Sequence, residues 1–395
     1  MCSSDLRRKR YLVNLEQAAV DEYGGKLLFS SGEVSFSSLD LLKREFLESN
    51  LSTVVMPKDY PLRHRFSKAD LKDILGRFKS LKVTVVGDLI VDEYVNCDPL
   101  GMSQEDPTIV VTPIQTDRFL GGAGIVAAHA RGLGAKVSYF SVAGQDESRQ
   151  FAIEKLNGMG VEVEVLEDGS RPTTLKQRFR ASGKTLLRVS HLRQHAINRE
   201  LIIKLSREIS DRLDDTDLLI FSDFNYGCLP QMLVDQISAE CRRHGVMMVA
   251  DSQSSSQVGD ISRFKDMELV TPTEREARLA VRDFDVGLVV LSEQVRARSG
   301  AKNVILTLGT EGLLVYAPMA HSENWHTDRL PAFNTAPKDP AGAGDSLLTC
   351  SAMALAVGAN IWEGSFLGSV AAALQVARVG NSPLSPGDIN LELVD

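Results

Sequence analysis

The sequence predicts an α/β protein with a mainly parallel central sheet and a small second sheet, and three observations indicate this fold. Short apolar runs such as residues 83–87 are almost continuous, as expected of strands whose two faces are both covered. Helical patterns separate these runs, which indicates right-handed βαβ connections. Two further stretches alternate polar and apolar residues, a pattern typical of strands with one face in water.

The predicted elements of the main sheet follow one another in order along the chain. Strands are expected at residues 83–87, 137–142, 218–222, 246–250, 269–271 and 304–308. Helices are expected between some of them, at residues 124–134, 199–213 and 230–244. This alternation of strands and helices predicts βαβ units and therefore parallel pairing.

Two segments, residues 94–120 and 161–191, interrupt this order. They contain the alternating runs 108–112 and 176–180. Because alternation is typical of strands with one wet face, we expect both segments to form a small lid sheet outside the main layers. A pair of surface hairpins without a moving role is the alternative.

Composition bounds the class of function. The chain has 395 residues, 43% of them apolar and 24% charged, with a net charge of −8, which is ordinary for a globular protein. There is no dominant basic block, so nucleic acid is not expected as the main partner. Five scattered cysteines show no metal-ligand spacing and fit a reducing compartment. No secretory signal and no membrane span are expected, which favours a cytoplasmic location.

The most informative motif covers residues 339–346 and is followed by an apolar helical stretch. The small residues Gly342, Ala343 and Gly344 let the backbone approach a ligand closely. Amide groups at a helix start lack intrahelical partners and attract an anion, most naturally a phosphate. Because a negatively charged carboxylate repels a phosphate, Asp345 is not expected to bind the anion. It is predicted instead to act as a base on a nucleophile. The alternative is a glycine-rich helix start in which Asp345 only complements the helix dipole.

This octet resembles the second signature of the PfkB, or ribokinase-like, carbohydrate kinases. The resemblance implies a ribokinase-like αβα sandwich with a β lid, and it implies ATP, Mg²⁺ and a monovalent cation as cofactors. It makes Asp345 the general base on a sugar hydroxyl and the glycine-alanine-glycine run the anion hole for the transferred phosphoryl group. It also makes Asp339 a candidate for binding the nucleotide. Pro340 departs from the family pattern but lies upstream of the anion hole.

Two carboxylates and two glycines are predicted to contact the sugar. Asp88 and Asp92 follow the first strand, and carboxyl ends of parallel strands open onto a binding crevice. The alternative is that either carboxylate caps the next turn. The stretch 85–94 resembles the heptose-7-phosphate kinase branch of the family. Gly121 and Gly122 resemble the first family signature and permit close approach of the substrate, or else serve only helix-to-sheet packing.

Positive side chains gather in the second lid segment. Period-two spacing places Lys176, Arg178 and Arg180 on one face, and Arg188 follows. Guanidinium groups suit a phosphate that the substrate already carries, whereas a charged edge strand in water is the alternative. The segment is similar to the heptose kinase pattern, which favours a phosphorylated sugar. Asp223 lies in a stretch that resembles the same branch and is predicted to line the substrate channel.

The remaining motifs concern the metal and the nucleotide. Glu276 lies in an element that resembles the metal-binding element of the family, and it is predicted to hold Mg²⁺ through water. Thr273 replaces the usual asparagine there, and a capping box of Thr273 with Glu276 is the alternative. Thr307, Gly309 and Gly312 belong to a loop that resembles the border of the adenine nucleotide, with a hairpin turn as the alternative.

Together these residues predict an ATP-dependent kinase that phosphorylates a hydroxyl of a sugar or sugar phosphate similar to heptose 7-phosphate. Ile125 stands at the position where the family has a sugar-binding asparagine, and Thr273 also departs from the family pattern. A catalytically impaired protein with a binding or regulatory role is therefore a second hypothesis. A nucleoside kinase is a third hypothesis, which the basic lid opposes because a nucleoside carries no phosphate. The resemblance also favours a homodimer formed through the lid.

Residues 1–70 do not join the α/β order. A strand at 24–29, a capped helix at 37–46 and a linker at 56–61 are expected there. The segment resembles the end of a nucleotidyltransferase module of the kind fused to some sugar kinases, but it has no nucleotide motif of that class. We therefore divide the chain into an extension of unassigned role, residues 1–70, and a kinase domain, residues 71–395.

Overall fold

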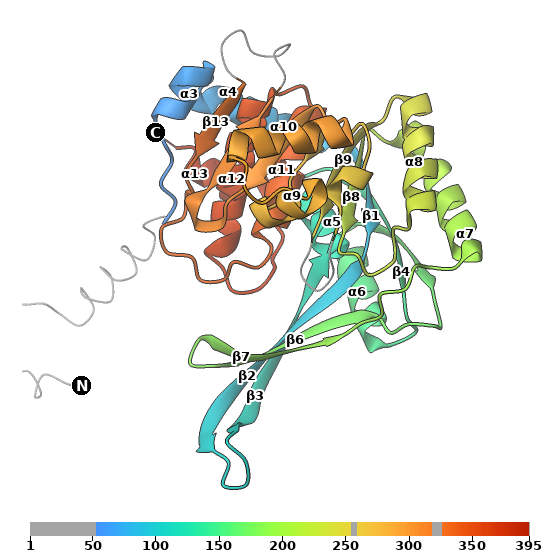
Figure 1. The fold of residues 1–395 in the computed structure, drawn as a ribbon, viewed down its shortest axis with the longest axis vertical. Helices are drawn as coiled ribbons and strands as arrows, with labels where there is room; N and C mark the ends of the chain where they lie inside the picture. Colours follow the sequence, from blue (N-terminus) through green and yellow to red (C-terminus); the bar gives the residue numbers. More distant parts are fainter. Residues whose placement is uncertain (1–52, 254–258, 318–325, 395) are drawn as a thin grey trace, which may run out of the picture. The chain divides into compact units, whose positions relative to one another are not determined.

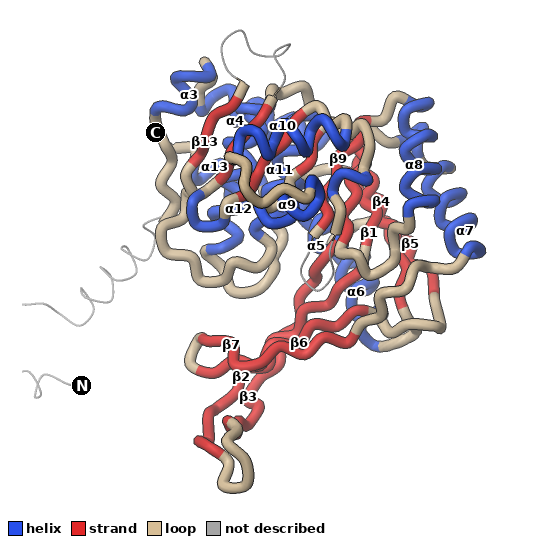
Figure 2. The backbone as a smooth tube through the Cα atoms, viewed as in Figure 1, coloured by secondary structure: helices blue, strands red, loops and turns tan. Residues whose placement is uncertain are grey.

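Two sheets organise the computed structural model, which describes residues 53–253, 259–317 and 326–394. The large sheet has the strand order β13-β12-β11-β10-β9-β8-β1-β4-β5 (Figures 1 and 2). All neighbours from β5 to β11 pair in parallel, and β12 and β13 add antiparallel pairs at one edge. The prediction of an α/β fold with a mainly parallel sheet is confirmed.

The strands of the large sheet are β1 (Lys82–Gly87), β4 (Lys136–Ala143), β5 (Glu162–Glu167), β8 (Leu218–Asp223), β9 (Met247–Ser252), β10 (Leu269–Val270), β11 (Asn303–Thr307), β12 (Leu313–Tyr316) and β13 (Thr327–Leu330). The α-helices are α3 (Asp59–His64), α4 (Lys68–Arg77), α5 (Ala123–Gly132), α6 (Glu147–Gly158), α7 (Arg199–Ser210), α8 (Gln231–His244), α9 (Glu274–Val281), α10 (Leu288–Ser299), α11 (Ala343–Ala356), α12 (Ile361–Val376) and α13 (Pro386–Glu392). Short 3₁₀ turns are η1 (Phe78–Ser80), η2 (Leu213–Asp215), η3 (Ile261–Arg263) and η4 (Gly309–Glu311). None of the helices in these ranges is both long and apolar enough to cross a lipid bilayer.

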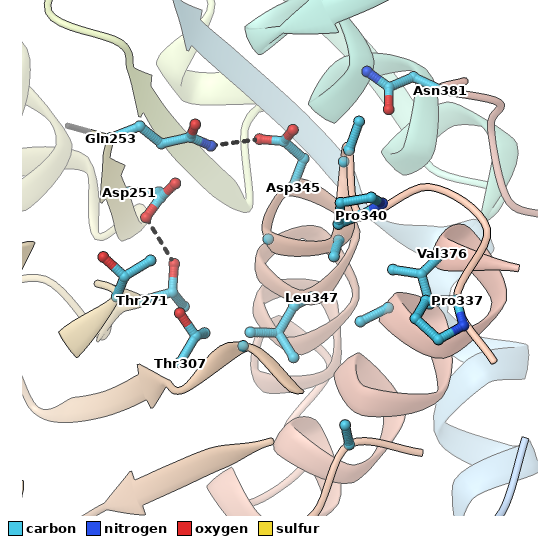
Figure 3. A pocket seen from close by; sticks show the side chains of 18 of the residues that line it. Asp251, Gln253, Thr271, Thr307, Pro337, Pro340, Asp345, Leu347, Val376 and Asn381 are labelled. Atoms are coloured by element: carbon cyan, nitrogen blue, oxygen red, sulfur yellow. Dashed lines mark hydrogen bonds between the residues drawn. The ribbon is translucent and has the colours of Figure 1, made fainter. Parts of the chain in front are cut away.

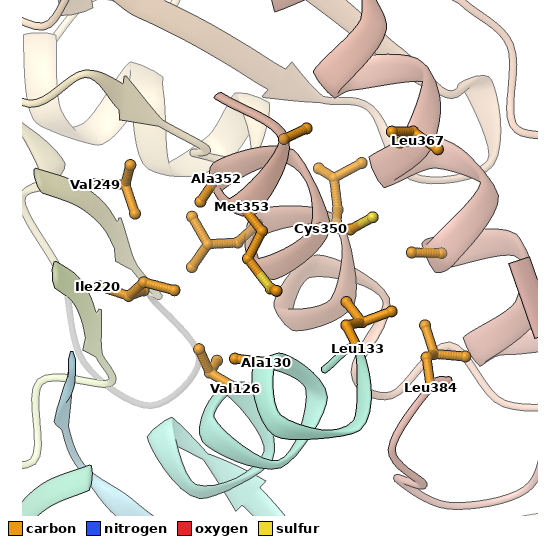
Figure 4. Packing of buried hydrophobic residues seen from close by; sticks show 14 of the residues in the cluster. Val126, Ala130, Leu133, Ile220, Val249, Cys350, Ala352, Met353, Leu367 and Leu384 are labelled. Carbon is orange, nitrogen blue, oxygen red and sulfur yellow. The ribbon is translucent and has the colours of Figure 1, made fainter. Parts of the chain in front are cut away.

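Strand alternation divides the apolar side chains between two cores, one on each face of the large sheet. In β1, Val85 packs with side chains of α5, α11 and α12, whereas Val86 packs with side chains of α7, α8, α9 and α10. Figure 4 shows part of the first core, where the Met353 side chain of α11 points toward Val126 of α5 and Ile220 of β8. This packing fixes α11, and with it the helix start that carries the main motif.

The small sheet contains β2 (Leu89–Met102), β3 (Ile109–Gly122), β6 (Thr174–Ala181) and β7 (Lys184–His191) in the order β3-β2-β6-β7. It projects from the body of the molecule as a long ribbon (Figure 1). The predicted first lid segment, 94–120, is therefore a hairpin that begins five residues earlier than expected. The second predicted segment, 161–191, is wrong at its start, because β5 pairs with β4 in the large sheet. β5 is an edge strand of the large sheet, and its alternating glutamate and valine residues are explained by one face that is exposed to water, as in a lid strand.

The described part of the predicted N-terminal extension belongs to the same compact unit as residues 71–394. Residues from Thr53 onward form one compact unit, so the predicted boundary at residue 70 is too late. The expected linker at 56–61 is partly helical, because α3 begins at Asp59 and contains the fully buried Tyr60. Pro61 is tolerated because it lies in the first turn of α3, where no intrahelical N–H bond is lost. The expected elements at 24–29 and 37–46 lie outside the described residues.

Candidate active site

A cavity of about 520 Å³ lies where the carboxyl ends of the parallel strands, the start of α11 and the small sheet meet. Figure 3 shows its interior with Asp345 on the first turn of α11. It brings together most of the predicted site residues: Asp92, Gly122, Lys176, Arg178, Arg188, Glu276, Thr307, Gly309, Gly312, Gly342, Ala343, Gly344 and Asp345. Four others, Asp88, Gly121, Asp223 and Asp339, do not line it.

The start of α11 presents unpaired backbone amides to this cavity. Gly342 is the N-cap in a left-handed conformation (φ 78°), and a side chain there would collide with Asn381. Within the described residues, the N–H groups of Gly342, Gly344 and Asp345 have no hydrogen-bond acceptor, whereas that of Ala343 points at the Pro340 carbonyl at 3.5 Å. Open space surrounds the position that a Gly344 side chain would occupy. The loop can therefore receive an anion.

Asp345 is a buried carboxylate beside these amides, with only 5% of its surface exposed. Burial raises its pKa to about 7, and the charge of Asp92 adds to the rise while Lys176 opposes it. The Gln253 side chain donates a hydrogen bond from Nε2 to Asp345 Oδ1 at 3.3 Å (Figure 3). A carboxyl group with this pKa can accept a proton near neutral pH.

Asp92 reaches the cavity from β2 of the small sheet. Gly121 on the paired strand β3 makes room for it, because any side chain at position 121 would collide with the Asp92 carboxylate. Arg178 Nη2 lies 3.6 Å from Asp92 Oδ1, an oxygen that accepts no hydrogen bond. Burial raises the pKa of Asp92, although Arg178 and Lys176 pull it down. Such a buried acceptor can bind a hydroxyl of a ligand.

Three cations of the small sheet face the same cavity. The Lys176 ammonium is buried and lies over the rings of Phe224 and Tyr226, 5.0 and 5.1 Å from their centroids. Arg178 on β6 pairs in register with Arg188 on β7, so their side chains emerge side by side. The described structure thus concentrates positive charge at the small-sheet end of the cavity.

Two more carboxylates, Asp251 and Glu276, line the cavity on its large-sheet side. Burial raises the pKa of Asp251 well above its usual range, and the charges of Glu276 and Asp345 raise it further. Thr271 donates a hydrogen bond from Oγ1 to Asp251 at 3.2 Å (Figure 3). Asp251 was missed from the sequence, although it follows a predicted strand just as Asp223 does. Gln253 and Asn381 were missed too, because they belong to no motif that we recognised.

Glu276 also forms the capping box that the sequence offered as its alternative role. Its Oε2 accepts a hydrogen bond from the Thr273 N–H at 2.8 Å, and the Thr273 hydroxyl accepts one from the Glu276 N–H at 3.2 Å. Glu276 still lines the cavity near Asp251, so capping does not remove it from the site. No group of three or more His, Cys, Asp or Glu side chains that could hold a metal ion occurs in the part of the chain that the structure describes.

Three predicted ligand-binding carboxylates instead stabilise the surrounding loops. Asp88 accepts hydrogen bonds from the backbone N–H groups of Phe224, Tyr226 and Cys228, at 2.8, 3.3 and 3.1 Å. Burial and the nearby charge of Asp223 raise the pKa of Asp88. The prediction that Asp88 binds the sugar is therefore corrected, since its oxygens hold this loop together.

The other two corrections have the same physical reason. Asp223 accepts hydrogen bonds from Ser252 (2.9 Å) and Arg263 (2.8 Å), away from the cavity. Asp339 accepts hydrogen bonds from Tyr94 Oη at 2.7 Å and from the Gly380 and Ala341 N–H groups, both at 3.1 Å. Asp339 therefore ties the α11 loop to the small sheet rather than facing a nucleotide.

The far end of the cavity is a largely apolar slot. Its walls are the β11–β12 hairpin, which includes Thr307, Gly309 and Gly312, and the segment Pro331–Asn334 after β13. The hairpin alternative for this loop is confirmed, because β11 and β12 pair antiparallel. Ile125 does not face the cavity: it is fully buried in the core on α5.

The sequence pattern of the family described as "pfkB family carbohydrate kinase" matches residues 80–386 of this chain. The chain belongs to the pfkB family of carbohydrate kinases. The family description agrees with the predicted phosphotransferase activity toward a hydroxyl group. The recognition of this family from the α11 motif is confirmed.

Among curated proteins, the chain is similar to those named bifunctional protein HldE. That of Desulfatibacillum aliphaticivorans is 29% identical over 323 residues, which cover 80% of this chain and 64% of the relative. That of Pelobacter propionicus is 28% identical over 335 residues, which cover 82% and 65%. This pfkB protein thus spans slightly less than two thirds of the relatives that it matches.

Solved structures agree on the fold. Phosphofructokinase-2 from Escherichia coli in complex with substrates and products superposes with a TM-score of 0.63 at 18% identity, over 79% of this chain and 98% of that one. Ribokinase from Thermotoga maritima superposes with a TM-score of 0.59 at 22% identity, over 79% and 99%. The predicted ribokinase-like fold is confirmed.

Proposed function

We propose that this pfkB kinase transfers the γ-phosphoryl group of ATP to a hydroxyl of a phosphorylated sugar similar to heptose 7-phosphate. The observation that carries the proposal is the pairing of Asp345 with the unpaired amides of Gly342 and Gly344 at one helix start. Because the base and the anion site belong to the same helix start, the base can accept the proton of the attacking hydroxyl while the amides bind the transferred phosphoryl group.

The residues divide the chemistry between them. Asp345 accepts the proton of the sugar hydroxyl as that oxygen attacks the γ-phosphorus, and the bond from phosphorus to the bridging oxygen breaks to release ADP. The amides of the α11 loop stabilise the negative charge on the phosphoryl oxygens. Asp92 orients the sugar by accepting a hydrogen bond, since one of its buried oxygens accepts none from the protein.

Mg²⁺ fits the carboxylates Asp251 and Glu276. Mg²⁺ is usually held by one or two carboxylates together with substrate phosphates and water, and these two repel each other in the protein alone. A divalent cation there would offset their charge and that of the ATP phosphates. A requirement for a monovalent cation stays a prediction, because we assign no described residue to it.

The substrate phosphate is proposed to bind at Arg178 and Arg188. Their register pairing brings two guanidinium groups to the open end of the cavity, and guanidinium forks suit phosphate oxygens. The same feature argues against a nucleoside as acceptor, which offers these arginines nothing to bind. A purely regulatory protein is disfavoured as well. Although Ile125 replaces the family asparagine, the buried Asp345 has a raised pKa that suits a general base.

A cytoplasmic location is proposed on the same chemistry. ATP is the phosphoryl donor there, and the four cysteines in the described ranges are free and buried rather than bridged.

We also propose a homodimer through the small sheet. Beyond Asn96 only β2 and β3 of this sheet continue, and this outer ribbon exposes Leu100, Met102, Ile109 and Ile114. A two-stranded ribbon is only marginally stable by itself, and exposed apolar side chains favour a contact with a partner. A second copy that covers this surface would bury these side chains.

Sedimentation equilibrium should give twice the monomer mass, and Ile114→Lys should shift the protein toward monomer. A wild-type monomer at tens of micromolar would contradict the dimer.

Replacing the base tests the mechanism. Asp345→Asn keeps the shape of the side chain but removes the proton acceptor, so kcat should fall roughly 10²–10⁴-fold. Because burial disfavours the charged carboxylate, the variant should be folded and no less stable, which thermal unfolding will show. Turnover within threefold of wild type would show that Asp345 is not the base.

The pH dependence of kcat/KM reports the same group. Asp345 must be ionised to accept a proton, and its raised pKa of about 7 means that it is protonated at lower pH. We expect kcat/KM to be constant above pH 8 and to fall about tenfold per pH unit below 7. An acid limb near pH 4, the range of an unperturbed carboxyl group, would contradict the buried base.

The sugar phosphate is tested with two arginine variants on the small sheet. Arg188→Gln removes a cation that lines the cavity, whereas Arg180→Gln removes one that does not. With heptose 7-phosphate as acceptor, the first should raise KM about tenfold, equivalent to roughly 1.4 kcal/mol, and the second should leave it unchanged. Equal use of heptose and heptose 7-phosphate by the wild type would contradict a phosphate site.

A further inference from the structure

Residues 53–66, here called the arm, lie outside the family match, which begins at residue 80. The arm contains α3 and the extended residues before it. None of its residues lines the active-site cavity. It nevertheless contacts two elements that line that cavity, the segment Pro331–Asn334 and helix α12.

The arm pairs with the back of the segment Pro331–Asn334 through its main chain. Val54 forms an antiparallel bridge with Asn334. The Val55 N–H donates to the Phe333 carbonyl at 2.6 Å, and the Thr335 N–H donates to the Thr53 carbonyl at 3.4 Å. The Val55 side chain is 61% exposed, so this residue contributes to the wall mainly through its backbone.

The arm also packs against α12, which contributes Ser369, Ala372, Ala373 and Val376 to the same end of the cavity. Tyr60 is fully buried, and its hydroxyl lies 3.0 Å from that of Ser365. The His64 ring stacks on the Trp362 indole with the ring centroids 4.1 Å apart. These contacts hold the arm on the outer side of the helix.

A third anchor fixes the arm to strand β13, which leads directly into Pro331. The Arg63 guanidinium donates to Asp328 at 2.9 Å, and His64 Nε2 lies 2.8 Å from the same carboxylate. Asp328 does not line the cavity. The arm therefore contacts the edge of the large sheet, the segment Pro331–Asn334 and α12, and Figure 1 shows α3 beside β13.

We propose that the arm positions the nucleotide-binding wall, so that residues before the region matched by the family pattern set the affinity for ATP without touching it. This inference rests on the proposed function, which places the nucleotide at the end of the cavity that Thr307 and Gly312 border. Its physical basis is the segment Pro331–Asn334, whose backbone bonds to the arm on one side while its other side lines the slot. Losing those bonds leaves the slot without a fixed width, and the nucleotide must then order it on binding.

Val55 offers a test that separates the backbone bond from the side chain. Val55→Pro removes the N–H that donates to Phe333, whereas Val55→Ala keeps it and alters only an exposed side chain. Calorimetric titration of the full chain with a non-hydrolysable ATP analogue and Mg²⁺ should give a Kd roughly three to ten times higher for Val55→Pro than for Val55→Ala. The Kd for heptose 7-phosphate should be the same in both.

A second variant covers the case in which Val55→Pro does not fold. Asp328→Asn weakens the anchor of Arg63 and His64 and should also raise the Kd of the ATP analogue. Leu156→Ala, a core variant on α6, controls for general loss of stability and should leave that Kd unchanged. If the wild type binds the analogue and Val55→Pro or Asp328→Asn binds it equally well, the inference is wrong although the proposed function stands. If the wild type does not bind the analogue, both are wrong.

Discussion

The burial of several carboxylates around one small cavity is the constraint on which the rest of the site depends. Burial raises the pKa of Asp345, Asp92 and Asp251, and a neighbouring carboxylate adds to each rise: Asp92 for Asp345, Asp339 for Asp92, and Glu276 with Asp345 for Asp251. The cation that opposes the rise in the pKa of Asp345 is Lys176, whose ammonium lies over two aromatic rings. Those rings are placed by backbone bonds to Asp88. Asp88, which does not line the cavity, thus helps to place the cation that acts on the carboxylate proposed as the base.

The sequence was sufficient for the fold and for the α11 loop, because both depend on local patterns. Apolar runs specify strands buried on two faces, and a glycine run before an apolar helix specifies a free helix start. Carboxylates that follow strands were harder to assign. Asp88, Asp223 and Asp251 all occupy such positions, and distant contacts decide whether each one faces the cavity or a neighbouring loop. Asp88 accepts hydrogen bonds from backbone N–H groups more than a hundred residues away, and Asp223 accepts one from Arg263.

Contacts between distant segments account for the other differences. The alternation of β5 is the same as that of a lid strand, and only its pairing with β4 shows which sheet it joins. The arm has no recognisable motif, yet it forms bonds with residues some 280 positions later in the chain. Asn381 donates a hydrogen bond to Asp92 and lies against Gly342, although it is far from both in the sequence. Such contacts leave no periodic signal in one sequence.

The inner end of the small sheet is fixed to the body, whereas its outer end is irregular. β2 begins just after β1 ends, and the clamped Asp88 between them fixes that joint. The ladder is irregular farther out, between Asn96 and Cys97 in β2 and between Phe179 and Arg180 in β6, and these two irregularities lie side by side. Bending along this transverse line would swing only the outer ribbon. Asp92, Lys176 and Arg178 lie on the inner side of the line, so such bending would leave the small-sheet groups that line the cavity in place.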